Sequence, residues 1–114
     1  MKIKVSEASG IVLDWMVAKC EGKFIKATTP VIMVMDEGKA YSYSYQPAKD
    51  GAQGGPIIER EKIATNFSVK RNCWFAENFM ETDAESGTTP LEAAMRCYVA
   101  SKLGYEVEVP DEIV

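Results

Sequence analysis

The stretch best suited to chemistry is glycine-rich and covers residues 52–56, Ala-Gln-Gly-Gly-Pro. Pro56 suits the first position of a helix, and the sequence predicts a short helix over residues 56–62. Glycines before a helix let a ligand approach the backbone, and the first-turn N–H groups carry partial positive charge. An anionic group such as a phosphate fits there. The stretch lacks the motifs of a Walker loop and of a dinucleotide fingerprint, so a tight turn into a helix is the competing interpretation.

Charged and aromatic side chains elsewhere could complete a nucleotide site. Arg60 can bind a phosphate in forked geometry, and Glu59 can accept hydrogen bonds from sugar hydroxyls or a base edge. Trp74 and Phe75 are adjacent on a predicted strand and face opposite sides, so one belongs to the core and the other could stack on a base. Surface charge, core packing and intrahelical ion pairs are the ordinary alternatives for such residues. The candidate ligand-binding residues are Gln53, Gly54, Gly55, Glu59, Arg60, Trp74, Tyr45 and Arg96.

The composition argues against several kinds of chemistry. The 114 residues contain no histidine, and the three cysteines have no metal-ligand spacing, so we expect no metal, no cofactor and no catalytic residue. The odd cysteine count and the lack of a signal-type apolar run predict a protein of a reducing cytosol. No segment reaches the ~20 apolar residues of a membrane span. The net charge of −4 argues against a nucleic-acid partner, although Arg60, Lys62, Lys70 and Arg71 could gather locally.

The clearest predicted helix covers residues 88–104. Thr89 and Glu92 have the spacing of a capping box, Pro90 fits the first helical position, and Gly104 ends the segment. Apolar residues recur within it at steps of three and four, which indicates one face packed on a core. This helix therefore organises the predicted fold.

A second helix is predicted over residues 9–20, and it is apolar on most of its circumference. Only Asp14, Lys19 and Glu21 are charged after residue 10. A surface helix needs one apolar stripe, so this helix must be covered on two sides. The sheet would supply one cover, and either the C-terminal helix or another subunit would supply the second. We therefore predict a homo-oligomer that associates through residues 9–20.

The remaining segments predict short strands, and the fold class is α+β. Residues 30–35 and 40–45 form a predicted hairpin around a turn at Gly38, and residues 23–29 form a linker or weak strand. Residues 77–87 are polar and predict a loop. The expected architecture is an antiparallel sheet of about four or five strands, with two main helices and one short helix packed on it, in a single domain over residues 1–114. The other predicted strands are residues 2–5, 66–69, 73–76 and 106–109.

Several segments together carry a family resemblance, over nearly the whole chain. They are residues 17–22, residues 52–61, Trp74 with Ala76, and residues 90–109 with the Pro-Asp-Glu tail at 110–112. In these the sequence resembles the small NinX-like family of bacteriophages, known from the nin region of lambdoid phages and of unknown function. The chain departs from the family pattern at Gly51, where the family has an aromatic residue, and at Leu91-Glu92, where it has Leu-Ile. The first departure removes a candidate stacking wall.

The resemblance implies a phage accessory protein that acts on host systems in the cytoplasm, the host bacterial cytosol. Combined with the candidate residues, it leads to the hypothesis of a non-enzymatic protein that binds or sequesters a small anionic, nucleotide-like ligand, such as an immune signalling nucleotide. The alternative is an interaction module that docks on a host or phage enzyme and modulates it. A third hypothesis is an enzyme that acts on nucleotides through Glu59 or Glu61.

Overall fold

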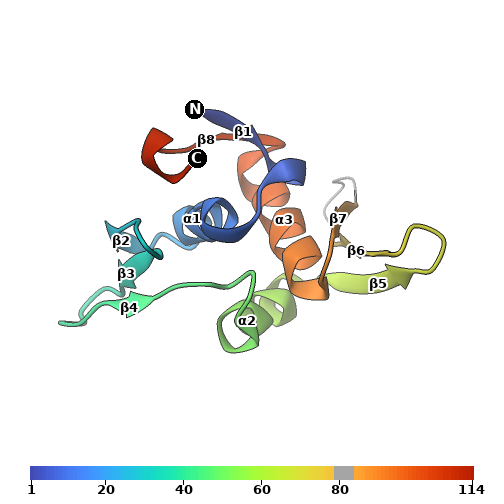
Figure 1. Ribbon diagram of the computed structural model, residues 1–114. Coiled ribbons are helices and arrows are strands. Elements are labelled where there is room, and N and C mark those ends of the chain that lie inside the picture. The colour runs from blue at the N-terminus through green and yellow to red at the C-terminus, as the bar shows by residue number, and fades with distance from the viewer. Residues whose placement is uncertain (79–83) are drawn as a thin grey trace.

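The computed structural model describes residues 1–78 and 84–114, and within them the chain is α+β, as predicted. The helices are α1 (Gly10–Cys20), α2 (Gly51–Glu61) and α3 (Pro90–Leu103). The strands of the described residues form three small antiparallel sheets rather than one sheet of four or five strands. The helices lie between the three sheets and separate them (Figure 1). The molecule is elongated, with dimensions of 45 × 29 × 23 Å.

Helix α3 lies at the centre, and seven of its 14 residues are buried. It packs against α1, α2 and strands of two sheets. Thr89 caps it, because its hydroxyl oxygen accepts a hydrogen bond from the Glu92 N–H at 3.0 Å. The Glu92 carboxylate accepts in turn from the Thr88 N–H at 2.9 Å, one residue before the position that a capping box uses. The predicted helix and its cap are thus confirmed, with a one-residue difference in the reciprocal bond.

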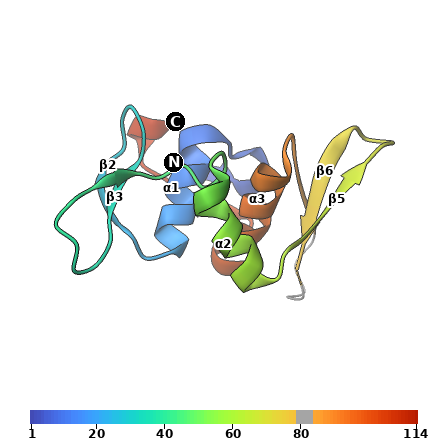
Figure 2. The ribbon, with the colours of Figure 1, turned by 90° about the horizontal axis from the view of Figure 1, so that it is seen from below.

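Helix α1 lies between α3 and the sheet of β2, β3 and β4, as both ribbon views show (Figures 1 and 2). Leu13, Met16, Val17 and Ala18 are each fully buried. The second cover that the sequence required is thus supplied by the C-terminal helix of the same chain. Self-association through this helix stays a prediction.

The predicted hairpin is confirmed as β3 (Met33–Met35) and β4 (Tyr43–Ser44), which pair antiparallel. The weak strand before it is β2 (Phe24–Ala27), which completes the three-stranded sheet. Lys23 stabilises this sheet, because its ammonium group donates to the Asp36 carboxylate at 2.7 Å and to the Tyr43 hydroxyl at 3.0 Å.

The second three-stranded sheet has the order β5-β6-β7 and projects from the opposite end of the molecule (Figures 1 and 2). Its strands are β5 (Ala64–Ser68), β6 (Cys73–Glu77) and β7 (Glu85–Gly87). Strand β7 lies within the segment 77–87 that was predicted as a loop, of which residues 79–83 lie outside the described residues. The third sheet pairs β1 (Lys2–Lys4) with β8 (Glu106–Glu108).

Candidate functional site

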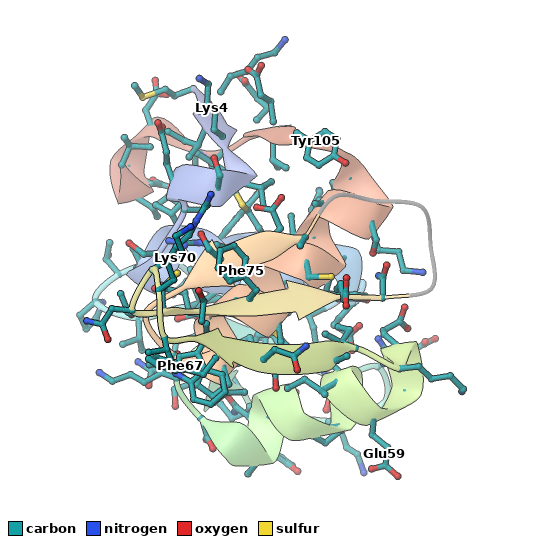
Figure 3. The ribbon with its side chains drawn as sticks, turned by 90° about the vertical axis from the view of Figure 1, so that its right-hand side faces the viewer. Lys4, Glu59, Phe67, Lys70, Phe75 and Tyr105 are labelled. Carbon is teal, nitrogen blue, oxygen red and sulfur yellow. The ribbon has the colours of Figure 1, made fainter. Side chains whose placement is uncertain are left out.

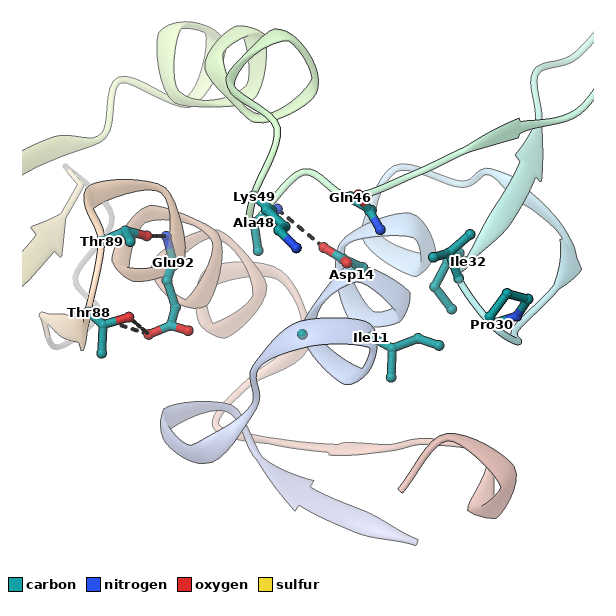
Figure 4. Close-up of a pocket in the computed structure, with 12 residues that line it drawn as sticks. Ile11, Asp14, Pro30, Ile32, Gln46, Ala48, Lys49, Thr88, Thr89 and Glu92 are labelled. Atoms are coloured by element: carbon teal, nitrogen blue, oxygen red, sulfur yellow. Dashed lines mark hydrogen bonds between the residues drawn. The ribbon is translucent and has the colours of Figure 1, made fainter.

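A pocket of about 370 Å³ opens between the first turns of α1, residues 30–32, residues 46–49 and the start of α3 (Figure 4). Four chain segments that are distant in sequence therefore supply its walls. The pocket is partly apolar, because Ile11, Pro30 and Ile32 line one side. Small-molecule sites commonly combine such an apolar wall with a few convergent polar groups.

The polar group at the floor of this pocket is Asp14, whose side chain is nearly buried, at 6% exposure. Its Oδ1 accepts a hydrogen bond from the Ala48 N–H at 3.2 Å, and Oδ2 has no hydrogen-bond partner among the described residues. Burial raises the pKa of this carboxyl to about 6, against the smaller lowering effects of the Ala48 hydrogen bond and the Lys49 charge. A carboxyl in a pocket with such a raised pKa is a candidate functional group.

The rim of the pocket adds groups of both charges. Lys49 is exposed and contributes a cation beside Asp14. The Gln46 side-chain amide makes no hydrogen bond within the described part of the chain, so it can both donate and accept toward a ligand. Glu92 is committed to the helix cap and to an ion pair with Arg96 at 3.5 Å. Asp14, Lys49 and Gln46 are therefore the groups available to a ligand.

The glycine-rich stretch has a different structure from the predicted one. Helix α2 begins at Gly51 and not at Pro56, because the Asp50 carboxylate accepts from the Ala52 N–H at 2.9 Å and caps the helix five residues earlier. The N–H groups of Gln53 and Gly54 donate to the Asp50 carbonyl at 3.0 and 2.9 Å. The amides that were expected to face an anion are thus bonded within the protein.

Gln53 and Gly54 fix the loop that lines the pocket. The Gln53 side chain accepts from the Gln46 N–H at 2.6 Å and donates to the Ser44 carbonyl at 2.8 Å. Gly54 is buried, and a side chain there would meet the Pro47 carbonyl and, at 2.7 Å, the Leu91 side chain. Both residues therefore position the segment that carries Gln46 and Lys49.

Arg60 lies in a separate cluster, at the C-terminal ends of α1 and α2. Its guanidinium donates a bidentate pair of hydrogen bonds to the Glu21 carboxylate, at 3.1 and 2.6 Å. It also donates to the Tyr98 hydroxyl at 3.1 Å. Burial alone would raise the pKa of Glu21, but hydrogen bonds from Arg60 and Tyr98 outweigh it and lower the pKa. Arg60 also contacts Glu61 at 2.8 Å. This cluster joins α1, α2 and α3.

The other candidate residues are spread over the molecule. Tyr45 is buried in the core at 4% exposure, and Trp74 is partly buried, with its ring 5.3 Å from that of Phe67. Arg96 donates to the carbonyls of Ala8 and Ser86 at 2.8 and 2.7 Å. Glu59 is exposed and Gly55 is partly buried, both on α2. The eight residues do not converge on one site, and ligand binding by them stays a prediction.

The residues at the pocket floor were missed in the sequence, although one signal pointed to them. Asp14 is the single charged residue between positions 11 and 18, on a helix that is otherwise apolar. A lone carboxylate in such a run is either exposed or held by a specific partner. Its partner, Ala48, is 34 residues away, and no local pattern connects the two.

Comparison with known proteins identifies the family. The profile of the family described as Bacteriophage P22, NinX matches residues 4–102, and the chain belongs to this family. It is thus a phage accessory protein, in agreement with the resemblance in its sequence. No curated protein matches the chain. Among residues 1–78 and 84–114, no helix has the length and apolar character to cross a membrane.

Proposed function

We propose that this phage protein binds a small nucleotide-like ligand in the pocket above Asp14, and that it sequesters the ligand rather than transforming it. The observation that supports the proposal is the buried carboxylate with one uncommitted oxygen at the floor of a pocket of about 370 Å³. The second carboxylate oxygen of Asp14 accepts no hydrogen bond from the described residues, so a ligand that donates to it would form a charge-assisted hydrogen bond.

The groups around the pocket match the parts of a purine nucleotide. Asp14 Oδ2 can accept from a ring N–H or an exocyclic amino group, such as the N2 amino group of guanine. The apolar side chains of Ile11 and Ile32 can contact the face of a base. Lys49 at the rim can contact a phosphate as a point charge.

Titration calorimetry tests the proposal with guanosine and adenosine monophosphates, cyclic dinucleotides and cyclic ADP-ribose isomers. We expect heat from at least one of them, and affinity roughly tenfold or more lower in Asp14→Asn, which keeps the shape but loses the charged acceptor. Affinity should fall roughly three- to fivefold between pH 7.5 and pH 5.5, because protonation of Asp14, whose pKa is about 6, removes the acceptor. Lys49→Ala should lower the affinity for phosphorylated ligands more than the affinity for the corresponding nucleosides.

Two further variants separate this pocket from the alternatives. Glu37→Gln changes an exposed carboxylate outside the pocket and should leave the affinity unchanged. Arg60→Ala should also retain binding, whereas a loss would favour the site predicted around Gly55 and Arg60. Absence of heat with every ligand contradicts the proposal. Recovery of a chemically altered ligand would indicate an enzyme.

A further inference from the structure

The sheet of β5, β6 and β7 has one covered face and one open face. Helix α3 packs on the side of Ala76 and Gly87, which are both buried. Phe75 lies next to Ala76 on the central strand and therefore points to the opposite side. Figure 3 shows its ring on the near side of the sheet, with no helix in front of it. Of the two adjacent aromatic residues, Trp74 thus faces the protein and Phe75 faces outward.

Cross-strand pairing places polar groups on both sides of this ring. Asn66 of β5 and Ser86 of β7 are directly opposite Phe75 in the register. Residues directly opposite in an antiparallel pair point to the same face, so the three side chains form one row across the sheet. The row consists of an amide, a partly exposed aromatic ring and a hydroxyl.

The turn at one end of this row is positively charged, although the protein as a whole is acidic, and the exposed Glu77 lies at the other end of β6, two residues from Phe75. Residues 62–76 contain Lys62, Lys70 and Arg71 and no acidic residue, which gives a formal charge of +3. Because the net charge of the whole chain is −4, the remaining residues together have a net charge of −7. Lys70 and Arg71 lie in the exposed turn between β5 and β6, and the Arg71 guanidinium is 5.8 Å from the centroid of the Phe75 ring.

We infer that this open face of the β5-β6-β7 sheet binds single-stranded nucleic acid. A base stacks on Phe75, the side chains of Asn66 and Ser86 contact the base edges, and Lys70 and Arg71 contact the phosphates. Only an unpaired strand presents the flat face of a base to a ring in this position. The site is independent of the pocket at Asp14 and lies on the other side of α3.

The composition of the face favours nucleic acid over a protein partner. A protein-docking site needs a contiguous apolar centre. The neighbours of Phe75 on this face are Asn66, Ser86, Cys73 and Glu77, so its ring is the only large apolar group among them. An isolated ring with hydrogen-bonding neighbours and adjacent cations matches the needs of a base and its phosphate.

Fluorescence anisotropy with a fluorescein-labelled twelve-nucleotide oligothymidylate and the matching oligouridylate tests the inference. We expect binding at low salt that weakens as salt is raised, and Phe75→Ala should weaken it about tenfold through lost stacking. The double variant Lys70→Glu/Arg71→Glu should abolish binding and its salt dependence. Phe75→Tyr should retain the affinity, because a tyrosine ring stacks equally well.

Phe24→Ala is the matched control. Phe24 is an exposed aromatic ring on a different sheet, with the Lys26 ammonium 5.5 Å from its centroid, so it offers the same pair of groups outside the proposed face. Its removal should leave the affinity unchanged. Circular dichroism melts establish that each variant is folded. The inference is overturned if the wild type gives no anisotropy change at low salt, if a duplex of the same length binds as tightly, or if folded Phe75→Ala binds like the wild type.

Discussion

Asp14 illustrates how a single residue can make stability depend on pH in an unusual direction. Its folded-state pKa of about 6 lies above the ordinary value of 3.8, so between these values the folded protein holds a proton that the unfolded chain has lost. The contribution of Asp14 to stability is therefore fully present below pH 3.8 and is lost as pH rises through 6. At neutral pH its charge opposes folding.

Replacing this residue with its neutral isostere should remove that penalty. We expect Asp14→Asn to raise the free energy of unfolding at pH 7.5 by up to about 2–3 kcal/mol, and the gain should shrink toward zero near pH 4. Urea denaturation at several pH values, with Glu37→Gln as an exposed control, measures the difference. A gain that is independent of pH would mean that the charge of Asp14 is not the cause.

Two adjacent glycines in α2 provide a second test at the residue scale. An alanine at position 54 would press on the Pro47 carbonyl and the Leu91 side chain, whereas a Cβ at position 55 meets nothing within 4 Å. We expect Gly54→Ala to destabilise the protein by about 1–3 kcal/mol through overpacking. Gly55→Ala should stabilise it by about 0.5–1 kcal/mol, because alanine favours a helix. Thermal melts of the two variants should shift in opposite directions, and equal shifts would contradict the close packing at Gly54.

At the scale of elements, hydrogen bonds among Arg60, Glu21 and Tyr98 join the C-terminal ends of α1 and α2 to α3. The pKa of Glu21 is lowered overall, so its contribution is present above its ordinary pKa of 4.5 and is lost as pH falls through the lower folded value. We expect Arg60→Ala to cost about 1–2 kcal/mol at pH 7, discounted because Arg60 is half exposed. Arg60→Lys should recover part of this lost stability, because lysine keeps the positive charge but cannot form the bidentate hydrogen bonds to Glu21.

The measurement is chemical denaturation at pH 7 and pH 3.5. The difference between Arg60→Ala and the wild type should narrow at the lower pH, because Glu21 of the unfolded chain, with its ordinary pKa of 4.5, is then mostly protonated. An equal loss at both values would indicate that the guanidinium contributes through packing on Tyr98, whose ring centroid lies 5.6 Å away.

The elements that could be predicted from the sequence are those determined by local patterns. The cap at Thr89, the turn at Gly38 and the hairpin of β3 and β4 are each encoded within a few residues, and the structure confirms them. The predicted start of α2 is wrong: Pro56 suits a first helical position, but Asp50 caps the helix further upstream. The pocket was not predicted because its walls come from segments joined only by the fold.

At the scale of the whole molecule, self-association through residues 9–20 stays a prediction. Five of the eleven residues of α1 are buried by their own chain, and its partly exposed residues include Ile11, Val12 and Trp15. If these form a contact between copies, sedimentation velocity should give a mass above 12.6 kDa that Val12→Glu returns to 12.6 kDa. A wild-type mass of 12.6 kDa at high concentration would contradict it. Lys19→Glu, on the exposed side of the helix, is the control.

The central position of α3 has a consequence for synthesis on the ribosome. Helices α1 and α2 and strands β5 and β6 are all made before residues 90–103, on which they pack. Strand β1 can pair only later still, because its partner strand β8 begins at Glu106. In a nascent chain that has emerged only as far as residue 89, these apolar segments thus lack α3, the helix on which they all pack. Folding is therefore expected to occur once residues 90–108 have left the exit tunnel, in one late step rather than from the N-terminus onward.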